Sequence, residues 1–108
     1  MYRMLTTALV VGAVAVAACT PTATDFQKEA EKNIASSKFA DAYAVQNGGT
    51  RVEFSNVACE TPANVEVGST FTCQATGDDD QTYSFTISVP EKNKFSVTSV
   101  TRVGPTGG

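Results

Sequence analysis

Two cysteines separated by thirteen residues constrain this chain of 108 residues more than any other feature. The segment between Cys59 and Cys73 contains Pro62 and Gly68, which favour turns. A disulfide across it would stabilise a small domain by about 3 kcal/mol in the chain-entropy model. Two Cys without any His make a poor zinc site, and the spacing is not that of a redox C-x-x-C motif. We therefore predict a Cys59–Cys73 disulfide and no metal site.

The first eighteen residues have the pattern of a secretory signal peptide. Arg3 lies in a short positive start, and residues 4–18 form an apolar run that ends in small residues. A membrane-spanning helix needs about 20 apolar residues, whereas this run is shorter and contains Thr6 and Thr7. We expect export to an oxidising compartment, where disulfides persist.

A third cysteine, Cys19, directly follows this run, and the chain has no fourth cysteine with which it could pair. Residues 16–19, Val-Ala-Ala-Cys, resemble the bacterial lipobox. The resemblance implies that Cys19 takes a diacylglyceryl group and becomes the N-terminus after cleavage. Because each buried methylene contributes about 0.8 kcal/mol, two acyl chains anchor a protein stably. We predict lipidation of Cys19 on the extracytoplasmic side of the cell membrane; an ordinary signal peptide with a chance cysteine is the alternative.

Composition narrows the classes of partner and of chemistry. The formal net charge is −3, and it becomes −4 without Arg3, so neither nucleic acid nor an anionic lipid surface would attract the domain. The chain has no His, the commonest general base near neutral pH, and Ser84 or Ser88 would lack a base to activate it as a nucleophile. We therefore predict no enzyme, no catalytic residue and no cofactor.

One helical segment is expected after a short Thr-rich tether at residues 19–24. Thr24 and Gln27 fit a capping box, and residues 47–49, Asn-Gly-Gly, end the segment. Its apolar residues lie on two nearly opposite faces that change over at Ser36. We expect the second half to pack on a sheet and the first half to be frayed or bent. The two faces are Phe26, Ala30, Ile34 and then Ala35, Phe39, Ala42, Tyr43, Gln46.

Beyond residue 50 the apolar period changes to 2, which is typical of an antiparallel sheet with one covered face. Slips in the alternation near Asn56 and Ser99 suggest β-bulges. We predict an α+β domain over residues 25–103, an N-terminal helix packed on a four-stranded antiparallel β-sheet, followed by a disordered tail at 104–108. The expected strands are 50–59, 69–76, 82–89 and 95–103, with turns at 77–80 and 90–94.

The region around the cysteine pair resembles a known family. The residues that carry the resemblance are Val57, Cys59, Val65, Gly68, Phe71 and Cys73, followed by an alternating strand. This pattern is similar to the domain of unknown function 4333 (DUF4333), and it departs from the family in that Glu60 and Thr61 precede Pro62. The resemblance implies a helix on an antiparallel sheet in exported, lipid-anchored proteins of actinobacteria. It implies no established activity and no catalytic residues.

Two surface features could either bind a ligand or be ordinary solvent-exposed structure. Residues 78–80, Asp-Asp-Asp, could hold Ca²⁺ but lack the spaced EF-hand pattern, so a solvated hairpin tip is favoured. The outward sheet residues could recognise a partner, although β-propensity alone also selects Thr and Ser there. We predict a binding or accessory module for a protein or envelope glycan; the alternative is an inhibitor or regulator of an exported enzyme. The outward residues are Thr70, Thr72, Gln74, Thr82, Ser84, Thr86 and Ser88.

Overall fold

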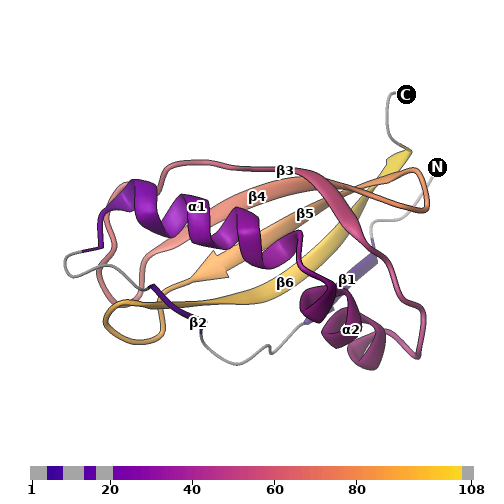
Figure 1. The fold of residues 1–108 in the computed structure, drawn as a ribbon, viewed down its shortest axis with the longest axis horizontal. Coiled ribbons are helices and arrows are strands. Elements are labelled where there is room, and N and C mark those ends of the chain that lie inside the picture. Colours follow the sequence, from indigo (N-terminus) through magenta and orange to yellow (C-terminus); the bar gives the residue numbers. More distant parts are fainter. Residues whose placement is uncertain (1–4, 9–13, 17–20, 106–108) are drawn as a thin grey trace.

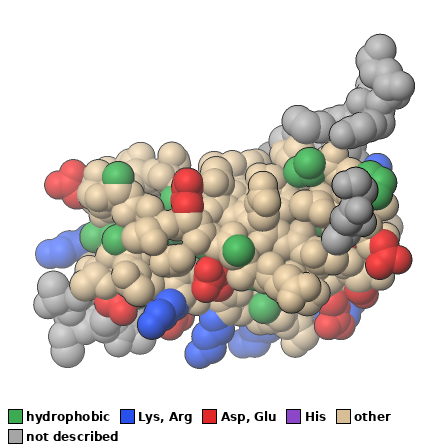
Figure 2. Space-filling view, turned by 90° about the horizontal axis from the view of Figure 1, so that it is seen from above, with side chains coloured by type: hydrophobic (Ala, Val, Ile, Leu, Met, Phe, Trp, Pro, Cys, Tyr) green, Lys and Arg blue, Asp and Glu red, His purple; other side chains and the backbone are tan. Residues whose placement is uncertain are grey.

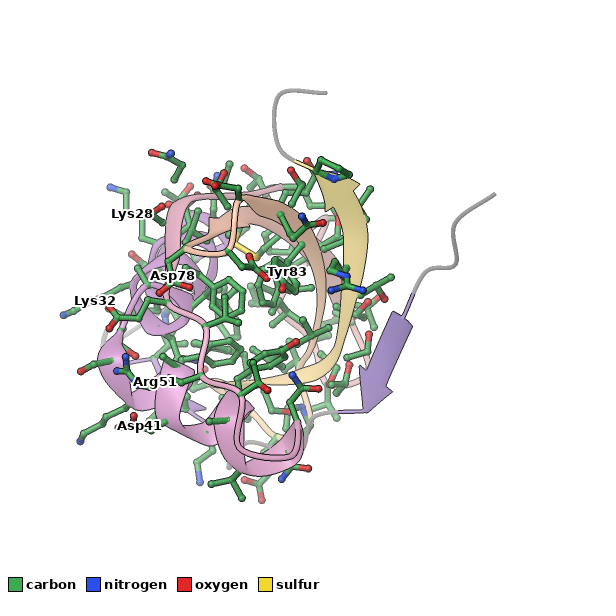
Figure 3. The ribbon with its side chains drawn as sticks, turned by 90° about the vertical axis from the view of Figure 1, so that its right-hand side faces the viewer. Lys28, Lys32, Asp41, Arg51, Asp78 and Tyr83 are labelled. Atoms are coloured by element: carbon green, nitrogen blue, oxygen red, sulfur yellow. A yellow bond between two sulfur atoms is a disulfide. The ribbon has the colours of Figure 1, made fainter. Side chains whose placement is uncertain are left out.

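Two helices pack on one curled antiparallel sheet in the computed structural model, which describes residues 5–8, 14–16 and 21–105. Strand order is β1-β6-β5-β4-β3, and β2 pairs separately with β6. Figure 1 shows α1 lying across one side of the sheet, and Figure 3 shows the curl from one end. This arrangement confirms the predicted α+β class. The elements are β1 (Leu5–Ala8), β2 (Val14–Ala15), α1 (Ala23–Ile34), α2 (Ser37–Gln46), β3 (Phe54–Cys59), β4 (Thr70–Gly77), β5 (Gln81–Ser88) and β6 (Lys94–Pro105).

The predicted helical segment is two helices, which divide where its apolar face changes. The Ser36 hydroxyl donates to the Asn33 carbonyl at 2.6 Å and accepts from the Phe39 N–H at 3.2 Å, so it caps α2. The break turns α2 relative to α1, and both apolar faces then reach the same core. Phe26, Ala30 and Ile34 are fully buried, so the expectation of a frayed first half is wrong.

The start of α1 also differs from the prediction. The helix begins at Ala23, within the predicted tether, because the capping box is formed by Thr22 and Asp25 rather than by Thr24 and Gln27. The Asp25 N–H donates to the Thr22 hydroxyl at 3.2 Å, and the Thr22 N–H donates to the Asp25 carboxylate at 2.9 Å. This pair satisfies two N–H groups and places a negative charge in the first turn.

Strands β3 to β6 correspond to the four predicted strands, except that β3 begins at Phe54 rather than at residue 50. Their alternation is as expected. Asn56 has a positive φ of 51°, and the pairing of β3 with β4 shifts there, which confirms the first bulge. The second shift lies beside Ser99, where β6 contains one residue more than β5. The end of β6 corrects the predicted tail: Gly104 and Pro105 pair with β5, and the described chain is extended up to that point.

The segment predicted as a signal peptide also contributes strands. β1 pairs with β6 from Ser99 to Arg102, and β2 pairs with β6 at Lys94 and Phe95. Among the described residues the sheet therefore has more than the four strands expected, because the prediction set residues 1–18 aside. Val16 is buried at 6% exposure and belongs to the core.

Aromatic side chains fill the core between α2 and the sheet. Phe54 lies at the centre, with ring centroids 5.0 Å from Phe85 and 5.1 Å from Tyr83, and both contacts are edge-to-face. The ring centroids of Phe39 and Tyr43 of α2 lie 5.7 and 5.5 Å from that of Phe54. Such pairs contribute about 0.5–1.5 kcal/mol each beyond burial, so α2 is held to the sheet mainly by ring packing.

Candidate functional site

The predicted disulfide joins Cys59 of β3 to Cys73 of β4, which lie directly opposite each other in the register. The sulfur atoms are bonded at 1.98 Å, and both residues are buried, at 7% and 1% exposure. The neighbouring Glu60 N–H donates to the Thr72 carbonyl at 3.0 Å, and the Glu60 carboxylate accepts from the Thr72 N–H at 2.8 Å. The disulfide therefore lies on the core side of two strand ends that hydrogen bonds between Glu60 and Thr72 also join.

Helix α1 holds the outer side of the same strand end through two polar side chains. The Cys59 N–H donates to Glu31 Oε2 at 2.9 Å, and the Cys59 carbonyl accepts from Gln27 Nε2 at 2.8 Å. Gln27 Oε1 in turn accepts from the Thr61 hydroxyl at 3.0 Å. β3 is the outermost strand on this side, so α1 supplies the partners that a further strand would otherwise supply.

Sequence reasoning missed Gln27 and Glu31. They are spaced i, i+4 on α1, which places them on one face of the helix, and that spacing is the signal available in the sequence. The same spacing occurs in many solvated helix faces. Only the packing of α1 against β3 shows that both side chains contact the disulfide strand.

The predicted lipidation site, Cys19, lies outside the described residues together with Ala17 and Ala18. Val16 is the described residue of the segment that resembles a lipobox, and its N–H donates to the Asn93 carbonyl at 2.9 Å. None of the described helices is long and apolar enough to cross a membrane.

Residues 78–80 form the turn between β4 and β5. The Asp80 N–H donates to the Gly77 carbonyl at 3.1 Å, and the Asp78 N–H donates to the Glu53 carbonyl at 2.9 Å. Asp80 has a positive φ of 62°, which Asp tolerates better than most residues. The described part of the chain brings no group of three or more His, Cys, Asp or Glu together for a metal ion.

Asp79 of this turn has a partner inside the molecule. The Tyr83 hydroxyl donates to Asp79 Oδ2 at 2.5 Å, and Figure 3 shows Tyr83 inside the curl of the sheet. Burial, and then this hydrogen bond, raise the pKa of the Tyr83 hydroxyl above its ordinary value. Burial and the charge of Asp79 likewise raise the pKa of Tyr43. Both hydroxyls are therefore neutral over the physiological range.

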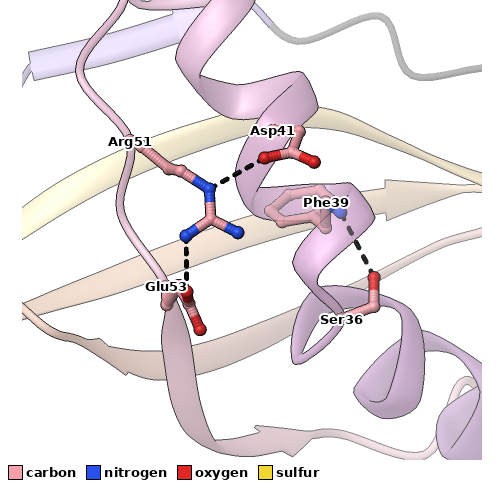
Figure 4. A network of polar contacts seen from close by, with 5 residues as sticks. All are labelled: Ser36, Phe39, Asp41, Arg51 and Glu53. Carbon is pink, nitrogen blue, oxygen red and sulfur yellow. Dashed lines mark hydrogen bonds and ion pairs between the residues drawn. The ribbon is translucent and has the colours of Figure 1, made fainter.

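A surface ion pair joins α2 to the chain before β3. Arg51 Nε donates to Asp41 at 2.8 Å, and Arg51 Nη1 contacts Glu53 (Figure 4). The hydrogen bond to Asp41, followed by that to Glu53, raises the pKa of the exposed Arg51 guanidinium. An exposed pair of this kind orients the connection between α2 and β3 and contributes little to stability.

The outward face of the sheet is polar as predicted. Thr70, Thr72 and Gln74 of β4 are exposed, whereas the corresponding Thr and Ser residues of β5 are half-buried. Figure 2 shows a side of the molecule on which hydrophobic side chains are scattered rather than gathered. Scattered apolar atoms are ordinary on a protein surface, so the face itself identifies no ligand.

Comparison with known proteins gives one result. A family model described as a domain of unknown function, DUF4333, matches residues 10–93. No curated protein and no solved structure matches the chain. The match covers most of the sequence, including α1, α2, the disulfide and strands β3 to β5. The chain therefore belongs to the DUF4333 family, whose domain has no assigned function.

Proposed function

We propose that this chain is an exported protein, anchored by lipid on Cys19 to the extracytoplasmic side of the cell membrane, and that its domain is a non-catalytic binding or accessory module. The observation that carries the proposal is the bond between Cys59 and Cys73. It leaves Cys19 without a cysteine of its own chain to pair with, at the end of a lipobox-like segment. A lipidated thiol explains this odd cysteine.

The position of α1 supports a domain held close to the membrane. α1 begins at Ala23, four residues after Cys19, and an extended chain spans at most about 3.6 Å per residue. At that length per residue, the start of α1 would lie within about 15 Å of the lipid anchor. Such a domain is suited to contact a protein or glycan at the membrane surface.

Replacing Cys19 by Ser tests the anchor. The Cys19→Ser protein should be released to the medium or remain uncut, because the acyl chains that hold it are lost. Membrane fractionation and intact mass measure the two outcomes, with Thr20→Ser as the matched control. Unchanged membrane retention and processing of Cys19→Ser would contradict the proposal.

A second candidate function, inhibition or regulation of an exported enzyme, is favoured by one pair of loops. The Gly68 N–H donates to the Val89 carbonyl at 2.9 Å, and the Val89 N–H donates to the Ser69 carbonyl at 3.0 Å, so the loops before β4 and after β5 are tied together. Beside them Val67 is 62% exposed. A pocket of about 570 Å³ lies there, lined by Val65, Glu66, Val67, Lys92 and Asn93.

Co-purification from envelope extracts distinguishes the two functions. An inhibitor should recover one enzyme and lower its rate, and Val67→Asp should weaken both effects, because a charge in the exposed loop disrupts an apolar contact. An accessory module should recover a partner whose activity is unchanged by the domain.

A further inference from the structure

The outer edge of β6 is covered by the segment that processing would remove. β1 pairs with β6 from Ser99 to Arg102, β2 pairs with Lys94 and Phe95, and the Val16 N–H donates to the Asn93 carbonyl at 2.9 Å. Cleavage before Cys19 would remove all three contacts. An edge strand with unpaired N–H and C=O groups readily accepts another strand.

We propose that the processed domain binds an extended, acidic peptide segment of a partner protein along this vacated edge, by strand addition. The inference rests on the proposed function, because it requires cleavage before Cys19. The segment would have branched apolar residues at alternate positions, like Val14 and Val16. Strand addition takes its affinity from main-chain hydrogen bonds and its specificity from pockets for alternate side chains.

The two edges of the sheet differ in this respect. The β3 edge keeps its cover after processing, because Gln27 and Glu31 of α1 bond to Cys59 and lie within the mature chain. The β6 edge is covered by residues before Cys19. Processing therefore opens one edge and leaves the other closed.

The place occupied by β2 shows what such a segment would contact. Val16 is 6% exposed and lies in the core, and Val14 packs against the same core. Residues two apart on a strand point to the same side, so a bound segment would place alternate apolar side chains there. Beside Val14 a pocket of about 220 Å³ separates the strand from α1 and α2, lined by Glu29, Lys32, Asn33, Ser36 and Lys38.

Asn33 is a second observation that points to a ligand in this pocket. Its Nδ2 atom is buried and has no hydrogen-bond partner among the residues that the structure describes. A buried amide without a partner is costly, and nearly all such groups are satisfied in native proteins. A carbonyl or carboxylate oxygen of a bound segment would be a suitable acceptor.

Charge distinguishes a partner peptide from a second copy of this chain. β6 carries Lys94 and Arg102 and no acidic residue, although Lys94 also pairs with Glu91 at 3.2 Å. The pocket adds Lys32 and Lys38 against Glu29. Pairing β6 with the β6 of another copy would bring these like charges into one sheet, which is unfavourable. An acidic segment complements them.

A peptide of the chain's own sequence tests the edge directly. The probe is Asp-Asp followed by residues 12–17, Gly-Ala-Val-Ala-Val-Ala, labelled with a fluorophore. Processed protein from membranes should bind it at least about tenfold more tightly than the uncut full chain carrying Cys19→Ser and made without export. An N-methyl group on the second valine, which takes the place of Val16, should weaken binding by about tenfold, because it removes the main-chain donor to the Asn93 carbonyl. Asn33→Ala should weaken binding about fivefold without changing the unfolding temperature.

A variant of the uncut chain tests the edge without relying on processing. Val14→Asp with Val16→Asp should release β2 and allow the Cys19→Ser full chain to bind the probe. The matched control, Val45→Asp with Val67→Asp, adds the same charges at exposed valines and should not bind. Amide hydrogen exchange at Phe95 and Val100 checks both variants, since these amides should remain protected in the control.

The outcomes separate the two proposals. Absence of probe binding by protein that intact mass shows to be cut before Cys19 would overturn the edge inference and leave the proposed function standing. An uncut chain in the envelope would overturn the proposed function and also the inference, because the edge of β6 would then stay covered. Self-association of the processed protein that the probe does not compete with would identify a second copy as the occupant and overturn the partner peptide.

Discussion

Tyr83 illustrates at the scale of one residue how the turn and the core depend on each other. Its ring is 2% exposed, and its hydroxyl reaches Asp79 across the turn at 2.5 Å. Gly77 makes room for it: a Cβ atom there would come within 2.8 Å of Tyr83 Cε1 and of Val52 Cγ1. The lack of a side chain at Gly77 thus leaves room for the hydrogen bond between Tyr83 and Asp79.

The titration of Tyr83 should reveal this contact. Its folded-state pKa is raised above the unfolded value of about 10, so the stabilisation is present below about pH 10 and is lost as pH rises through the folded pKa. Asp79→Asn should move the pKa of Tyr83 back toward its ordinary value, because the carboxylate acceptor favours the neutral phenol. Ultraviolet absorbance of tyrosinate measures the titration. Asp78→Asn is the control, and identical titration curves for the two variants would contradict the assignment.

At the scale of elements, α1 acts as a cover for the edge strand β3. Gln27 and Glu31 satisfy the outward N–H and C=O of Cys59, while the adjoining face of α1 buries Phe26 and Ile34. The helix therefore contributes to the core and protects an edge from pairing with another chain. The two polar contacts lie at the same strand end as the disulfide.

Removing the Glu31 carboxylate should destabilise the domain. Glu31→Ala leaves the partly buried Cys59 N–H without its acceptor, and we expect a loss of about 1–2 kcal/mol. Glu31→Gln retains an oxygen acceptor and should lose less. Urea unfolding measures the effect, with Lys28→Ala on the exposed side of α1 as control (Figure 3). Equal unfolding midpoints for Glu31→Ala and Lys28→Ala would show that the contact adds no stability.

At the scale of the whole molecule, the domain is small enough to benefit from a covalent link. A domain of fewer than about 100 residues buries only a modest fraction of the surface of its unfolded chain. Its free energy of unfolding is typically about 5–15 kcal/mol. The Cys59–Cys73 bond closes a segment of sequence separation 14 between paired strands. It therefore acts on the unfolded chain as well as on the β3–β4 pair.

Loss of the disulfide should lower the free energy of unfolding by about 3 kcal/mol, through the larger entropy of the unfolded chain. The double variant Cys59→Ala with Cys73→Ala tests this by urea unfolding. Wild type unfolded in reducing buffer is the comparison and should lose a similar amount. A double variant as stable as the oxidised wild type would contradict the expected contribution of the bond.

Local patterns in the sequence were sufficient for several parts of the fold. The alternation of apolar residues predicted the four strands β3 to β6, and the slip at Asn56 predicted a bulge that the structure contains. The change of helical face at Ser36 marked the place where the structure divides the single predicted helical segment into α1 and α2. These features follow from neighbours along the chain, whose side chains must all face one core.

The sequence by itself determined the strands β3 to β6, their inward faces and the partner of Cys59, because periodicity and cysteine number are properties of the chain alone. Only the tertiary structure decided what covers each edge of the sheet. The contact of Gln27 and Glu31 with Cys59, and the pairing of β1 and β2 with β6, join segments distant in sequence. Such contacts depend on how whole elements pack, and no local pattern encodes them.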